Sequence, residues 1–123
     1  MKQIRRTRIV LSAISANLCE QPEIFALINL GLVESLASGS LTPTQAVKRF
    51  YHADNCLYVK KVLRQREANA IMSHGVQLPD LFESLPPEEA QREFYHELET
   101  IRSLCLKLFD RRRSPNAATH TIA

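Results

Sequence analysis

The strongest helical signal in this chain comes from residues 87–110, which read PEEAQREFYHELETIRSLCLKLFD. Apolar residues recur there every three or four positions, the spacing that gathers them on one face of an α-helix. They are Ala90, Phe94, Leu98, Ile101, Cys105 and Leu108. Acidic residues follow Pro87 in the first turn, where the helix dipole favours negative charge. The stretch predicts a long helix with one face in a hydrophobic core.

Three more helices are predicted upstream of this one. They are expected at about residues 3–18, 22–37 and 43–74, with a short helical turn near 78–84. The helix that follows Pro22 ends at Gly39, a typical helix stop. The next begins with a capping box formed by Thr42 and Gln45, and no breaker follows until Gly75. No segment alternates as a strand does, so the predicted fold is all-α, an antiparallel bundle of four main helices.

The composition is that of one globular domain. The chain has 123 residues, of which 45% are hydrophobic and 24% charged. A single helical domain is expected at residues 1–113, with a flexible C-terminal tail at 114–123. No apolar run approaches the roughly 18 residues of a membrane span, so no membrane partner is expected. Three cysteines without a Cys-x-x-Cys pair argue against a disulfide framework and indicate reduced thiols in a cytoplasmic protein; no cofactor is predicted.

Charge is unevenly distributed along the chain. The net charge of +3 is too small to indicate a nucleic-acid binder by itself. Residues 42–74 carry six basic residues against two acids, whereas residues 75–110 carry eight acids against three basic residues. Oppositely charged segments of one short chain usually neutralise each other across the fold or across a dimer. The alternative is that the basic residues bind an anionic partner.

Asp54 is the main candidate for chemistry. On the predicted third helix it shares a face with apolar residues such as Phe50, so it is expected to be buried and paired with a hydroxyl or a cation. If the protein is an enzyme, its predicted catalytic residues are Asp54, His52 and Glu97, in a metal-dependent or proton-transfer reaction. His52 and Cys56 have the i, i+4 spacing that can chelate a metal ion from one helix. Two ligands do not make a site, and no metal is predicted.

Two surface features indicate partners. Leu27 and Leu30 lie opposite the inner stripe of the second helix, which predicts a protein interface, most simply in a homodimer. Arg49, Lys60 and Arg64 form an outer stripe on the third helix, which makes them candidates for binding an anion such as a nucleic-acid phosphate. No helix-turn-helix spacing or aromatic platform accompanies that stripe.

The leading interpretation is therefore a non-catalytic helical interaction or regulatory protein. A small enzyme built around Asp54 is the first alternative, and a weak nucleic-acid binder is the second. No catalytic motif with a complete set of residues is present, so the enzyme interpretation ranks below that of an interaction protein.

Overall fold

The computed structural model describes residues 8–14 and 20–122, with side chains as far as Asp110. The described chain is helical and contains no strand, which confirms the all-α prediction. Its elements in chain order are η1 (Leu11–Ala13), α1 (Gln21–Ser38), α2 (Pro43–Arg49), α3 (Ala53–Tyr58), η3 (Val59–Leu63), α4 (Arg66–Ser84) and α5 (Pro87–Ile122). Of these, η1 is a 3-10 turn and η3 is a short π-helix. No helix in this part of the chain is long and apolar enough to cross a membrane.

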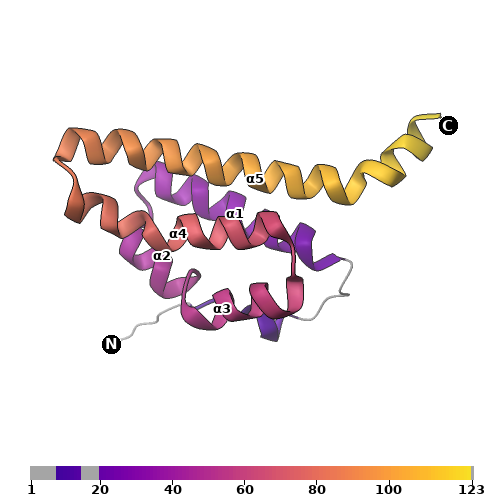
Figure 1. Cartoon of the computed structure of the whole chain (residues 1–123), viewed down its shortest axis with the longest axis horizontal. Helices are drawn as coiled ribbons and strands as arrows, with labels where there is room; N and C mark the ends of the chain where they lie inside the picture. The colour runs from indigo at the N-terminus through magenta and orange to yellow at the C-terminus, as the bar shows by residue number, and fades with distance from the viewer. Residues whose placement is uncertain (1–7, 15–19, 123) are drawn as a thin grey trace.

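Three long helices, α1, α4 and α5, form the centre of the molecule. α4 and α5 make an antiparallel hairpin, and α1 packs against α5 (Figure 1). In the same view α2 and α3 lie on the side of α4 that faces away from α5. The stripe predicted for residues 87–110 is buried in this core along its whole length, from Ala90 to Leu108. Its period therefore identified both the helix and its buried face.

The local signals at two helix ends are confirmed. α1 ends at Gly39, which adopts the left-handed conformation with φ of 83°. At the start of α2 the Gln45 amide donates to Thr42 Oγ1 at 3.1 Å, and the Thr42 amide donates to Gln45 Oε1 at 2.9 Å. This is the predicted capping box, and it satisfies two amides that the first helical turn leaves without partners.

The prediction of one continuous helix over residues 43–74 is wrong. α2 stops after Arg49, because Phe50 and Tyr51 both turn fully into the core. His52 then caps α3, with its ring accepting from the Asn55 amide. The Asn55 side chain donates to the carbonyl of Phe50 at 2.8 Å. Polar side chains that bond nearby backbone groups compete with the helical ladder, and here they replace it.

A second break separates α3 from α4. The π-helix η3 ends at Arg64, which has a left-handed φ of 56°, and the chain then turns back into α4. α4 does not stop at Gly75; it runs through Gly75 and Pro79 to Ser84. The helical turn predicted near 78–84 is therefore the last part of α4.

The two ends of the chain also differ from the prediction. Within residues 8–14, Val10 and Ile14 are extended on either side of η1, so the predicted helix over 3–18 is wrong for this segment. The rest of that predicted helix, residues 3–7 and 15–18, lies outside the described residues. α5 continues past residue 110, where its end was predicted, as far as Ile122. The flexibility of residues 114–123 stays a prediction.

Candidate functional site

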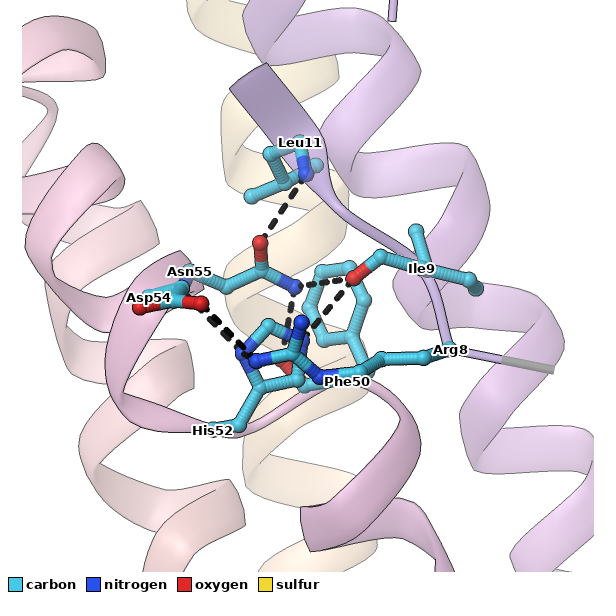
Figure 2. A network of polar contacts seen from close by, with 7 residues as sticks. All are labelled: Arg8, Ile9, Leu11, Phe50, His52, Asp54 and Asn55. Carbon is cyan, nitrogen blue, oxygen red and sulfur yellow. Dashed lines mark hydrogen bonds and ion pairs between the residues drawn. The ribbon is translucent and has the colours of Figure 1, made fainter. Parts of the chain in front are cut away.

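A network of polar contacts fastens the N-terminal segment to the loop between α2 and α3 and to the first turn of α3 (Figure 2). Asn55 lies at its centre and is 1% exposed. Its Oδ1 accepts from the Leu11 amide at 2.9 Å, while its Nδ2 donates to the carbonyls of Ile9 at 2.9 Å and Phe50 at 2.8 Å. One side chain thereby satisfies backbone groups from two segments more than forty residues apart. Such a buried amide with its partners in place specifies one docking geometry.

His52 reinforces the same contact. Its Nε2 donates to the Ile9 carbonyl at 2.9 Å, and its Nδ1 accepts from Arg8 Nη2 at 3.3 Å and from the Asn55 amide at 3.4 Å. These partners assign the proton to Nε2. The Ile9 amide completes the docking by donating to the Arg49 carbonyl at 2.8 Å. Both ring nitrogens of His52 are thus engaged in holding the fold, which leaves neither free to bind a metal ion.

Asp54 does not occupy the buried position predicted for it. Its side chain is 68% exposed and forms an ion pair with Arg8 at 2.9 Å. Because the helix is broken before Ala53, α3 does not continue the helical register of α2. The neighbouring Asn55 therefore faces the core in place of Asp54. The hydrogen bond from Arg8, and then its charge, hold the pKa of Asp54 below its usual range.

The replacement Arg8→Ala is expected to raise the pKa of Asp54 towards that of an ordinary aspartate, because both the hydrogen bond and the nearby charge are lost. NMR titration of the Asp54 carboxyl measures this directly. A depressed carboxyl pKa contributes stability above the unfolded pKa and loses it as pH falls through the folded pKa, so any stabilising effect of the pair disappears in acid. An unchanged Asp54 titration in the variant would show that Arg8 is not its partner.

The predicted catalytic set is not assembled. His52 and Asp54 share Arg8 at the start of α3, but Glu97 lies on α5, where it is hydrogen-bonded to His74 of α4. Figure 1 places α3 and α5 on opposite sides of α4. Among the described residues no group of three or more His, Cys, Asp or Glu side chains could hold a metal ion.

The described thiols are not activated as nucleophiles. Cys56 is half-buried beside a pocket of about 330 Å³ between η3 and α4, and burial raises its pKa. Cys105 is fully buried on α5, and burial raises its pKa to about 12. Raised pKa values disfavour the reactive thiolate. Cys19 lies outside the described residues.

The predicted anion-binding stripe assumed one continuous helix over residues 43–74, which the structure does not have. Arg49 ends α2, Lys60 lies in η3, and Arg64 follows η3 in the left-handed conformation. They therefore do not share one face of one helix. Of the two leucines predicted to form an interface on α1, Leu27 is 59% exposed, whereas Leu30 is half-buried and packs against the core; the interface itself stays a prediction.

A feature that sequence reasoning missed is a groove at the end of the molecule where α4 turns into α5. It has a volume of about 300 Å³ and is lined by the end of α1, the start of α2, the last turn of α4 and the first turns of α5. Its aromatic residues form a row in which the ring centroids of Phe82 and Phe94 are 5.3 Å apart, and those of Phe94 and Tyr95 are 5.4 Å apart. Phe82 and Tyr95 remain 42% and 44% exposed. Leu36 and Leu41 also line this space, which we call the aromatic groove.

Acidic side chains surround this end of the molecule. Five exposed carboxylates lie between the end of α4 and the second turn of α5, against one basic residue, Arg92. They are Asp80, Glu83, Glu88, Glu89 and Glu93. Within the described part of the chain none of them forms an ion pair. The sequence held a signal for this site, namely Phe82 and Tyr95 within an acidic segment, but the helices that complete the groove are distant in sequence.

The fold and this groove define a small all-α protein with an aromatic, acid-flanked recess at one end. A family model described as "Protein of unknown function (DUF3969)" matches residues 17–122, and the chain belongs to that family. The match covers α1 to α5 and begins after the docked segment 8–14. No curated protein and no solved structure matches the chain.

Proposed function

We propose that this is a non-catalytic helical interaction protein whose aromatic groove binds a protein segment with apolar side chains flanked by lysine or arginine. The observation that carries the proposal is the groove itself, which leaves Phe82 and Tyr95 more than two fifths exposed beside five carboxylates that form no ion pair with any described residue. Large aromatic side chains around a recess are typical centres of binding energy in protein interfaces.

The size and charge of the groove narrow the class of partner. A volume of about 300 Å³ is at the small end for ligand pockets, so it suits one or two anchoring side chains rather than a large cofactor. The surrounding carboxylates attract a basic partner and disfavour an acidic one, which affects specificity and association rate more than affinity. The same carboxylates oppose the approach of phosphates, which makes nucleic acid a poor occupant of this groove.

Two observations support the non-catalytic part of the proposal. The residues proposed for catalysis either hold the N-terminal segment or pair across α4 and α5. The thiols of Cys56 and Cys105 have raised pKa values.

Cys56 and Cys105 are free, which supports a cytoplasmic location, where thiols remain reduced.

The test is binding of a designed helical peptide of leucine and lysine, compared with a peptide in which glutamate replaces every lysine. We expect the leucine–lysine peptide to bind, measured by fluorescence anisotropy, and the leucine–glutamate peptide not to bind. Phe82→Ala with Tyr95→Ala should weaken binding by tenfold or more, because the anchoring rings are lost. Leu27→Ala, at an exposed apolar position on α1 away from the groove, is the control and should bind as the wild type does. Equal binding of both peptides, or no loss in the double variant, would disprove the proposal.

A further inference from the structure

A cluster of basic residues lies at the opposite end of α4 from the groove. Between residues 57 and 66 there are four exposed cations and no acid. They are Lys60, Lys61, Arg64 and Arg66. α4 has 19 residues, so its two ends are about 28 Å apart. Figure 1 shows the connection between α4 and α5 at the left end of the molecule and the turn from α3 into α4 at the right.

The basic end also presents apolar side chains. Leu57 is 53% exposed and Val62 is 42% exposed, while Val59 between them is buried and holds the turn to the core. The wider π-helical turn and the left-handed Arg64 form the reversal of the chain at this point. We call residues 57–66 the basic turn. It combines exposed apolar side chains with flanking cations, which is the chemistry that the aromatic groove selects.

Within the described residues, the opposite charges of these two ends do not pair with each other. The described ion pairs of the chain join Arg8 to Asp54, Arg66 to Glu67, His74 to Glu97 and Arg102 to Glu99. None of them connects the basic turn with the carboxylates around the groove. Such charge segregation is expected to be compensated either across the fold or between molecules. Among the described residues no ion pair provides the first, which favours compensation between molecules.

We propose that the partner of the aromatic groove is the basic turn of a second copy of this chain. This inference rests on the proposed function of the groove and adds the identity of its occupant. Leu57 and Val62 would pack against the exposed rings of Phe82 and Tyr95, and the cations of the turn would face the carboxylates of the neighbouring copy. Groove and turn are different surfaces, so the contact is head-to-tail, and an open assembly of any length keeps one free groove at one end and one free turn at the other. Such association continues into short chains or closes into a ring.

Salt dependence is the first measurement. Because the contact joins exposed charges of opposite sign, it is strongest at low ionic strength and weakens as salt screens them. Sedimentation velocity of the wild type at about 100 μM in low salt should show species larger than a monomer, which shift towards the monomer in 0.5 M sodium chloride. A wild type that is monomeric under both conditions overturns the inference.

Two complementary variants test the head-to-tail geometry. Lys60→Glu with Lys61→Glu disables the turn and leaves the groove intact, whereas Phe82→Ala with Tyr95→Ala disables the groove and leaves the turn intact. Each variant alone should be monomeric. Mixed in equal amounts they should form a dimer and nothing larger, because only one productive contact, between the intact turn and the intact groove, remains. A mixture that stays monomeric contradicts the proposal.

Leu27→Glu is the matched control on α1. If it alone dissociates the wild-type assembly while the turn variant remains assembled, the contact is the two-fold interface on α1 and the head-to-tail model is wrong. The leucine–lysine peptide separates this inference from the proposed function. If the turn variant binds the peptide but the wild type does not self-associate, the groove is a binding site for another protein, and the second-copy proposal alone fails.

Discussion

Gly75→Ala is expected to lower the free energy of unfolding by about 1–3 kcal/mol, although alanine is the better helix former. A Cβ at this position would lie 2.5 Å from two ring atoms of Tyr51. The ring cannot move away easily, since it is 1% exposed, packs edge-on against Phe50 at 5.2 Å and donates from its hydroxyl to Asn29 Oδ1 at 2.7 Å. Burial raises the pKa of Tyr51, so its hydroxyl remains a donor over the working pH range.

Gly31→Ala is the matched control for this prediction. Gly31 is an exposed position inside α1, and a Cβ there would have no atom within 4 Å. Only the helix propensity changes, so this variant should be more stable than the wild type by about 0.5–1 kcal/mol. Urea unfolding midpoints at constant slope measure both effects. A Gly75→Ala protein as stable as the Gly31→Ala protein would contradict the packing of α4 against Tyr51.

Asn55→Ala is expected to destabilise the protein by about 3 kcal/mol, because the Leu11 amide and the Phe50 carbonyl would both be buried without their partner. Asn55→Asp should also be destabilised. It keeps an acceptor for Leu11 but places a carboxylate against the carbonyls of Ile9 and Phe50. Denaturant midpoints give the size of the effect, and hydrogen exchange of the Leu11 amide shows whether segment 8–14 has been released.

Asp54→Asn is the matched control on the neighbouring residue. The Asp54 side chain is largely exposed, so the variant should unfold at the wild-type midpoint. If Asp54→Asn were the more damaging of the two, the register of α3 would differ from the one described, and Asp54 rather than Asn55 would hold the N-terminal segment.

The sequence alone did not predict correctly which of Asp54 and Asn55 is buried. Periodicity placed both residues on one long helix and assigned the buried position to Asp54. The helix is broken by the burial of Phe50 and Tyr51, and the amide of Asn55 binds a segment more than forty residues away. The burial of the two rings and the contact with the N-terminal segment are tertiary interactions, so the helical period alone could not have predicted the register.

The aromatic groove likewise depends on contacts between segments that are distant in the sequence. Its rings are Phe82, Phe94 and Tyr95, of which Phe94 was predicted to be buried. The place of Phe82 beside Phe94 was not predicted, because the short turn near 78–84 was separated from the helix that became α4. The groove needs α1 and α2 as well, since Leu36 and Leu41 complete its lining. Four elements meet there only after α4 and α5 have paired.

By itself the sequence determined the all-α class, the bounds of α1, the capping box of α2 and the buried face of α5. Caps and amphipathic periods act within a few residues of their own position, so these features are encoded where they occur. Only the tertiary structure decided where the predicted third helix breaks, that α4 passes through Gly75, and that opposite charges lie at the two ends of α4. Those outcomes depend on burial and on hydrogen bonds between distant segments, whose free energies exceed the local helix preference of the residues involved.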